Sequence, residues 1–176
     1  TGTGRRTAEP KRDASDASDA AGRSVSAHGV IGGMRLTTNG WPTLGVMLFT
    51  YNRFETARRT IDALLTHAHY SGPLWLHIAD DGSPPVGETP YLEALARVAI
   101  KHARAANSSV TVTAASSGQR GYGASYNLAT QYVHETCPVL IPLEDDWELQ
   151  RPLDLDPLVR TLLDGVAAPR DRGFTG

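Results

Sequence analysis

The expected folded part of the chain begins with the run TLGVMLFT, residues 43–50. It is short and apolar, and it is bounded by Gly-Trp-Pro before and Tyr-Asn-Arg after, which is typical of a buried strand. In the next segment apolar residues recur every three or four positions from Phe54 to Ala68, which predicts an amphipathic helix. Ser-Gly-Pro at 71–73 ends that helix, and residues 74–79 (LWLHIA) are expected to form a second strand.

The same alternation continues along the chain. A second helix is expected from residue 92 to about 106, and a third strand at 110–114 (VTVTA). A third helix at 124–135 and a fourth strand at 139–143 (VLIPL) follow, with a short helix at 158–163. This β-α-β-α-β-α-β order predicts a mostly parallel sheet with helices on both faces, a three-layer α/β/α fold.

Composition limits the remaining classes. The 176 residues suit one domain, and a net charge of −2 provides no general basic field, so we expect no nucleic-acid partner. Between residues 1 and 26 the only apolar side chain larger than Ala or Pro is Val25, so we expect residues 1–40 to be a disordered or poorly ordered leader and 41–176 to be the folded part. The sequence has no apolar run long enough to span a bilayer and no signal-peptide pattern, which favours a cytoplasmic protein.

Polar residues follow every expected strand. The four stretches are 50–53 (TYNR), 80–83 (DDGS), 116–123 (SSGQRGYG) and 144–147 (EDDW). In open α/β sheets, ligands bind outside the carboxyl ends of the strands, so these stretches mark the expected site. Two of them supply five carboxylates, and like charges at close range raise one another's pKa unless a cation lies between them. An oxygen-only ligand set suits Mg²⁺ or Mn²⁺.

Each of these signals also has a purely structural interpretation. Asp81 and the glycine after it could simply form a turn in which Asp80 accepts a loop N–H. The acidic run at 144–146 could be solvated, although the apolar strand before it favours a fixed position. The glycines at 118, 121 and 123 could only shape a loop, and three histidines, His69 among them, are expected on helix surfaces.

Several known site classes are excluded by missing motifs. No GxGxxG follows the first strand, which argues against a dinucleotide site. The chain also has no GxxxxGK[ST] loop of a P-loop NTPase and no GxSxG elbow of an α/β-hydrolase.

Four motifs in this order, TYNR, ADDGS, GYGASYN and LEDDW, resemble those of glycosyltransferase family 2, which has the GT-A fold. The similarity extends over residues 42–163, and it implies that this chain is the donor-binding half, with the fold truncated after the metal motif. Thr50, Tyr51 and Arg53 are implied to line a nucleoside pocket, and Asp81 to accept a hydrogen bond from the base. The full donor-binding set that the resemblance implies is Thr50, Tyr51, Arg53, Asp80, Asp81, Gly121, Asn127 and Asp145. The implied ligands of Mn²⁺ or Mg²⁺ are Glu144, Asp145 and Asp146, with Glu in place of the first Asp of a literal Asp-x-Asp.

The resemblance also implies an activity. A sugar would pass from a nucleotide-diphosphate sugar to the hydroxyl of a carbohydrate or lipid-linked acceptor, and a lipid-linked acceptor would bring the protein to the inner membrane face. The family's acceptor base lies well beyond the metal motif. No acidic pair stands at such a position after Asp146, so we expect the catalytic base to lie outside this chain.

Two other functions stay open. A sugar-phosphate nucleotidyltransferase would normally carry a glycine-rich loop with a basic residue after the first strand, and TYNRFE contains no glycine. A non-catalytic nucleotide- or metal-binding module would use the same acidic edge without transferring a sugar.

Overall fold

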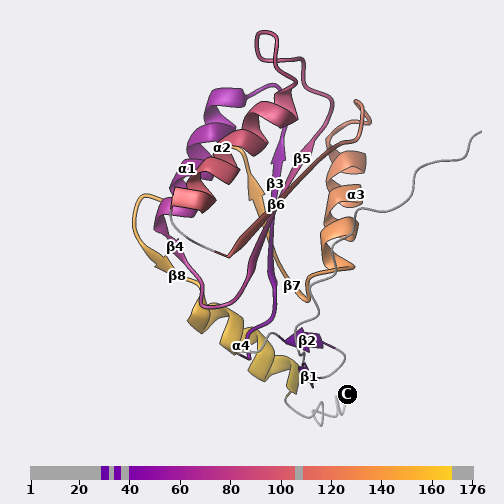
Figure 1. Ribbon diagram of the computed structural model, residues 1–176. Coiled ribbons are helices and arrows are strands. Elements are labelled where there is room, and N and C mark those ends of the chain that lie inside the picture. Colours follow the sequence, from indigo (N-terminus) through magenta and orange to yellow (C-terminus); the bar gives the residue numbers. More distant parts are fainter. Residues whose placement is uncertain (1–28, 32–33, 37–39, 106–108, 168–176) are drawn as a thin grey trace, which may run out of the picture.

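A four-stranded parallel sheet forms the centre of the computed structural model, with strand order β6-β5-β3-β7 (Figure 1). The strands are β3 (Leu44–Thr50), β5 (Leu74–Asp80), β6 (Val110–Ser116) and β7 (Val139–Glu144). Every pairing between them is parallel, which confirms the predicted sheet. The two central strands, β3 and β5, are buried along their whole length, as expected for apolar runs covered on both faces.

Helices cover both faces of the sheet, so the predicted three-layer architecture is confirmed (Figure 1). Helices α1 (Phe54–His67) and α2 (Tyr91–Ala105) pack on one face, around a core that includes Ile61 and Leu95. Helix α3 (Tyr122–His134) packs on the other face. It begins two residues earlier than the periodicity predicts.

Close packing beneath α3 depends on a glycine in β3. A β-carbon built on Gly45 would lie 2.6 Å from Val133 Cγ1 and 3.0 Å from Cys137 Cβ. The helix can therefore approach the sheet at this point only because Gly45 has no side chain.

The structure describes residues 29–31, 34–36, 40–105 and 109–167. Within the predicted leader, β1 (Gly29–Ile31) and β2 (Met34–Leu36) form a small antiparallel pair. The prediction for residues 1–28 lies outside the described part of the chain.

The chain after β7 returns to the opposite end of the sheet. Two short strands that the sequence analysis did not predict, β4 (Ala68–His69) and β8 (Leu153–Asp154), pair in parallel there. Helix α4 (Asp156–Ala167) follows, and its Val159 packs with Leu44 beneath the amino ends of the strands. The predicted helix at 158–163 is therefore real but longer, and His69 lies on a strand and not on a helix surface as predicted.

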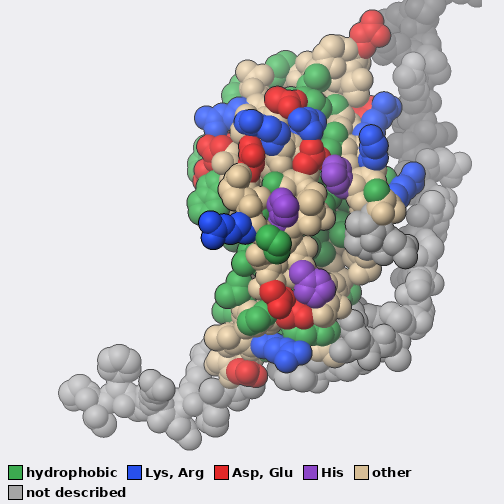
Figure 2. Space-filling view, turned by 90° about the vertical axis from the view of Figure 1, so that its left-hand side faces the viewer, with side chains coloured by type: hydrophobic (Ala, Val, Ile, Leu, Met, Phe, Trp, Pro, Cys, Tyr) green, Lys and Arg blue, Asp and Glu red, His purple; other side chains and the backbone are tan. Residues whose placement is uncertain are grey.

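The outward faces of α1 and α2 carry charges of both signs (Figure 2). Arg58 pairs with Glu55 and Asp62, and Arg97 pairs with Glu93 one helical turn away. These pairs are partly or largely exposed, so each contributes little to stability.

Candidate functional site

A pocket of about 240 Å³ opens at the carboxyl ends of β3 and β7. Its position fits the rule that parallel α/β sheets bind ligands at this edge. It joins predicted site residues from two strand ends far apart in the sequence. The residues that line it are Phe49, Thr50, Tyr51, Arg53, Tyr122, Glu144 and Asp145.

Asp145 is the buried carboxylate of this pocket. Only 5% of the residue is exposed. The hydroxyl of Thr50 donates to its Oδ2 at 2.9 Å, and the hydroxyl of Thr60 donates to its backbone oxygen at 2.7 Å. The acidic run is therefore not simply solvated, because its middle residue is fixed by the core.

A chain of hydrogen bonds leads to Asp145. A hydroxyl has one proton, so Thr50, which donates to Asp145, accepts from the hydroxyl of Tyr91 at 2.6 Å. The backbone N–H of Arg53 donates to the Tyr91 oxygen at 3.3 Å. Burial is the main cause that raises the pKa of Tyr91, so its hydroxyl stays protonated at neutral pH and acts as a donor. The relay orients the Asp145 carboxylate with Oδ1 left for another partner.

That partner is the side chain of Arg53. Its Nη1 lies 3.3 Å from Asp145 Oδ1 and 3.3 Å from Asp146 Oδ2. The Arg53 and Asp146 side chains are 59% and 51% exposed, whereas that of Asp145 is 8% exposed. One cationic nitrogen thus lies between the two carboxylates, at the mouth of the pocket.

Tyr122 is a pocket residue that the sequence analysis missed. Its hydroxyl donates to Glu144 Oε1 at 2.7 Å, and this hydrogen bond is the main cause that raises the pKa of Tyr122 to about 12. Its ring stacks on Tyr126 and meets the ring of Phe49 edge to face, with centroids 4.9 Å apart. The available signal was an aromatic residue between two glycines, at the end of the polar stretch that follows the third strand.

Asp81 lies outside this pocket and organises the neighbouring loop. Its carboxylate accepts the hydroxyls of Ser117 at 3.1 Å and Ser125 at 2.5 Å, and the backbone N–H groups of Arg120 at 2.9 Å and Gly121 at 3.1 Å. These bonds, that of Ser125 above all, lower the pKa of Asp81 and outweigh the effect of burial. The sequence analysis expected crowding to raise the pKa of such carboxylates, which is wrong for Asp81. Its contact with a nucleobase stays a prediction.

Asp80 fixes the turn after β5. Its carboxylate accepts the backbone N–H groups of Gly82 at 3.0 Å and Ser83 at 2.9 Å, and also the Ser83 hydroxyl. Gly82 has a φ of +90°, a conformation that favours glycine. The structural interpretation of this Asp-Asp-Gly-Ser stretch is therefore confirmed. The glycines of the next loop also shape the backbone, since Gly118 and Gly121 both have positive φ.

A hydrogen bond joins the stretch after β3 to the loop between β6 and α3: the hydroxyl of Tyr51 accepts from Gln119 Nε2 at 3.3 Å. Asn127 is different, because it lies exposed on α3 and does not line the pocket. Its donor-binding role stays a prediction.

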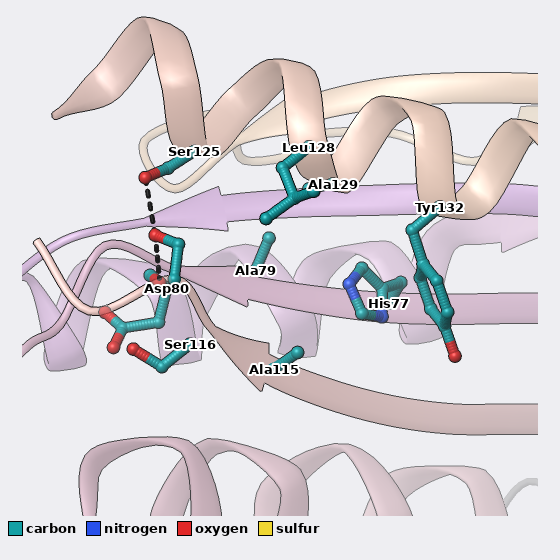
Figure 3. A pocket seen from close by; sticks show the side chains of 10 residues that line it. His77, Ala79, Asp80, Ala115, Ser116, Ser125, Leu128, Ala129 and Tyr132 are labelled. Atoms are coloured by element: carbon teal, nitrogen blue, oxygen red, sulfur yellow. Dashed lines mark hydrogen bonds between the residues drawn. The ribbon is translucent and has the colours of Figure 1, made fainter. Parts of the chain in front are cut away.

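A second hollow of about 260 Å³ lies between α3 and strands β5 and β6 (Figure 3). Its walls are mostly apolar and include Ala115, Leu128 and Tyr132. His77 lines it and bonds to Thr113 at 2.9 Å. Burial lowers the pKa of His77, so the imidazole is neutral at pH 7. The hollow lacks a cluster of charged groups for a phosphate or a metal among its lining residues.

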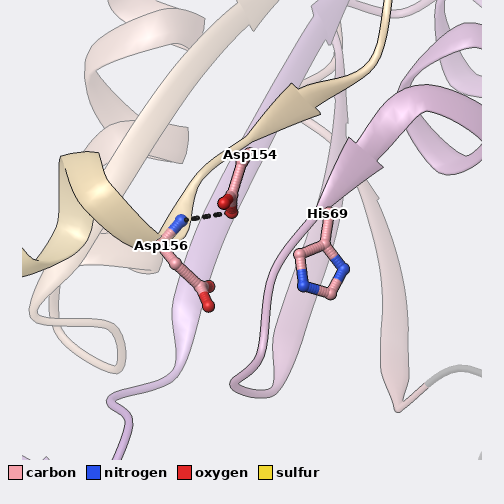
Figure 4. A group of neighbouring side chains, drawn as sticks. All are labelled: His69, Asp154 and Asp156. Carbon is pink, nitrogen blue, oxygen red and sulfur yellow. Dashed lines mark hydrogen bonds between the residues drawn. The ribbon is translucent and has the colours of Figure 1, made fainter.

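Three further side chains with metal-binding atoms converge at the opposite end of the sheet: His69, Asp154 and Asp156 (Figure 4). Asp156 accepts the N–H of Ser71 at 2.8 Å and its hydroxyl at 2.5 Å, and Asp154 accepts the N–H of Asp156 at 3.1 Å. These bonds hold the start of α4 against the segment between α1 and β5. They give the two carboxylates a structural role.

Solved structures with a related backbone include TarS from S. aureus. The chain aligns with TarS over 71% of its own length, with 16% identity and a TM-score of 0.43. It aligns equally with a form of TarS spanning residues 1–349, over 71% of its length, with 16% identity and a TM-score of 0.42. The alignments cover 19% and 31% of the two TarS chains, so this chain spans less than a third of either. No protein-family model and no curated protein matches the sequence.

Among the described residues, no helix combines the length and the apolar character needed to cross a membrane.

Proposed function

We propose that this chain binds the nucleoside diphosphate of a nucleotide-sugar donor together with Mn²⁺ or Mg²⁺, as the donor-binding part of a family 2 glycosyltransferase. The observation that carries the proposal is the convergence of Asp145 Oδ1 and Asp146 Oδ2 on one cationic nitrogen, beside an aromatic-lined pocket at the carboxyl edge of a parallel sheet. A diphosphate held by a cation needs such a carboxylate pair, and a base needs flat apolar surfaces beside it.

The ligand atoms of the acidic run suit a hard divalent cation. Asp145, Asp146 and Glu144 offer only oxygen atoms, which Mg²⁺ and Mn²⁺ prefer. The nitrogen of Arg53, at 3.3 Å from both aspartates, marks a place where a single positive charge contacts the two carboxylates at once. Asp145 is held in that orientation by Thr50, so part of the ligand set is formed in advance.

Other residues of the site would bind the remaining parts of the nucleotide-sugar. Tyr51 and Tyr122 present rings at the pocket, 44% and 53% exposed, on which a base or sugar can stack. Arg53 is long enough to pair with a phosphate, since a guanidinium binds phosphate through two parallel N–H groups. A divalent cation held by the carboxylates would stabilise, as a Lewis acid, the negative charge that grows on the leaving phosphate oxygen.

The rest of the activity belongs to the same proposal. The bond from the sugar to the diphosphate breaks and one to an acceptor hydroxyl forms, and the acceptor proton passes to a base that we assign to no residue of this chain. The acceptor is a carbohydrate or a lipid-linked sugar, and the protein is cytoplasmic, peripheral at the inner membrane face for a lipid-linked acceptor.

Thermal unfolding of the full chain tests donor binding. UDP, GDP and TDP are each added with and without Mn²⁺, and we expect one nucleotide to raise the unfolding temperature in the presence of metal, because a ligand that binds only the folded state stabilises it. Asp146→Asn should reduce the Mn²⁺-dependent part of this shift far more than the metal-independent part.

Arg151→Gln provides a control, because it changes the charge of an exposed residue that does not line the pocket. A cooperative transition that none of the three nucleotides moves would contradict the proposal and favour a binding module for another ligand. A shift that Asp146→Asn lowers equally with and without Mn²⁺ would contradict the metal role.

A further inference from the structure

Arg53 lies where the proposed cation has to bind. Its Nη1 is 3.3 Å from an oxygen of each aspartate, whereas an oxygen ligand of Mg²⁺ lies about 2.0–2.1 Å from the ion. A metal that contacts both carboxylates would therefore lie within a short distance of the guanidinium nitrogen. Two positive charges at such a separation repel strongly. Arg53 and the cation cannot both occupy the space between Asp145 and Asp146.

The geometry of the ion pair is that of a contact that can be released. Charge-assisted N–H···O⁻ bonds are normally about 2.7–2.9 Å long, and the strongest arginine pairs use two nitrogens on one carboxylate. Arg53 instead uses one nitrogen on two carboxylates, at 3.3 Å from each, and its side chain is 59% exposed. The pair with Asp146 is exposed on both sides and contributes little to stability, and the pair with the buried Asp145 uses a single nitrogen at a long distance.

The carboxylate, by contrast, is fixed. Asp145 is held on its other oxygen by Thr50 and on its backbone oxygen by Thr60. The main chain of Arg53 is anchored as well, because its N–H donates to Tyr91 and its C=O accepts the N–H of Ala57 at 2.9 Å. The guanidinium is thus the part that can move, while the main chain of Arg53 stays in place at the start of α1.

We propose that Arg53 and the divalent cation exchange places. Without ligand, the guanidinium balances the charge of Asp145 and Asp146. When the nucleotide-sugar and the cation bind, Arg53 leaves the carboxylates and pairs with the diphosphate. The same residue therefore competes with the cation in the unliganded protein and binds phosphate in the liganded one. This inference rests on the proposed function and adds the regulation of that site.

The exchange predicts effects of opposite sign from one substitution. In Arg53→Gln, Mn²⁺ alone should bind about two- to fivefold more tightly, since it no longer competes with an exposed ion pair. The nucleoside diphosphate at saturating Mn²⁺ should bind about tenfold more weakly, since a charge-assisted bond to phosphate is lost. Free Mn²⁺ is measured by its electron paramagnetic resonance signal, and nucleotide binding by calorimetry.

Two further variants serve as controls. Arg59→Gln removes the same charge from the first two turns of α1, which Arg53 directly precedes, but Arg59 pairs with Glu148 at 3.2 Å and not with the aspartates, so Mn²⁺ affinity should stay unchanged. Arg53→Lys keeps a positive charge at the site and should keep the Mn²⁺ affinity close to that of the natural chain.

The outcomes separate this inference from the proposed function. If the natural chain binds Mn²⁺ through Asp146 and Arg53→Gln binds it equally or more weakly, the exchange is overturned while the donor site stands. Tighter Mn²⁺ binding in Arg59→Gln as well would reduce the effect to net charge and also overturn it. If neither the natural chain nor Arg53→Gln binds Mn²⁺ or any of the three nucleotides, both proposals fail. Metal binding that appears only in Arg53→Gln supports the exchange.

Discussion

Replacing Thr50 by Val tests whether the site is built into the core. The Thr50 hydroxyl is buried, and it both donates to Asp145 and accepts from Tyr91. Valine has nearly the same shape, so the substitution removes the hydroxyl without leaving a cavity. It leaves Asp145 Oδ2 without its donor and the O–H of Tyr91 without its acceptor, and each such loss costs about 1–3 kcal/mol. We therefore expect the free energy of unfolding to fall by about 2–4 kcal/mol.

Urea unfolding followed by circular dichroism measures this change. In a domain of this size, about 2–4 kcal/mol corresponds to a fall of roughly 4–16 °C in the unfolding temperature. Thr50→Ser is the matched control, because it keeps the hydroxyl and loses one buried methyl group, which costs about 1 kcal/mol. The difference between the two variants isolates the hydrogen bonds.

A double-mutant cycle with Asp145→Asn assigns the effect to the carboxylate. Residues in direct contact typically show coupling energies of about 0.5–3 kcal/mol. We expect Thr50→Val to cost less when Asp145 is already neutral. Equal stabilities of Thr50→Val and Thr50→Ser, or a coupling energy near zero, would refute the reasoning that the core orients this carboxylate.

Two other substitutions address packing and pH. Gly45→Ala should destabilise the fold by about 1–3 kcal/mol in urea unfolding, because the new methyl group overlaps Val133. Gly123→Ala should be nearly neutral, because a methyl group there meets nothing within 4 Å beyond its chain neighbours and the backbone of its own helix. Equal effects would contradict the close approach of α3. The Asp81 carboxylate has a lowered pKa in the folded protein because Ser125 and neighbouring donors bind its charged form. Its contribution to stability is therefore complete above about pH 4 and is lost as the pH falls through the folded-state pKa. Asp81→Asn should show a smaller loss of unfolding free energy than the natural chain between about pH 4 and 2, and an identical profile would show that the charge does not matter.

The parallel sheet, the helices that cover it and the edge at which the candidate site lies could all be predicted from the sequence. Short apolar runs and three- to four-residue periodicity are local properties, so β3 and α1 begin within a residue of their predicted positions. Parallel strands bring their carboxyl ends together, so TYNR and EDDW could be placed at the same edge before any distance was known, whereas the pairing of β3 with β7 came from the structure. The two-residue strands β4 and β8 escaped prediction because two residues show no periodicity.

Which carboxylates are open to a ligand depends on contacts between distant parts of the chain, so it could be seen only in the folded structure. The sequence does not distinguish the three carboxylates Glu144, Asp145 and Asp146, yet only Asp145 is buried. Its hydrogen-bond partner Thr50 lies 95 residues away along the chain, so no local pattern could indicate this burial. Asp81 looks equally available, but the N–H of Arg120 in the loop before α3 and the hydroxyl of Ser125 in the first turn of α3 already bind it. Tyr122 likewise enters the pocket because the start of α3 packs against Phe49 near the end of β3. Hydrogen-bond partners so distant along the chain leave no trace in local pattern, which is why the sequence predicted the edge of the sheet and the fold selected the residues that face a ligand.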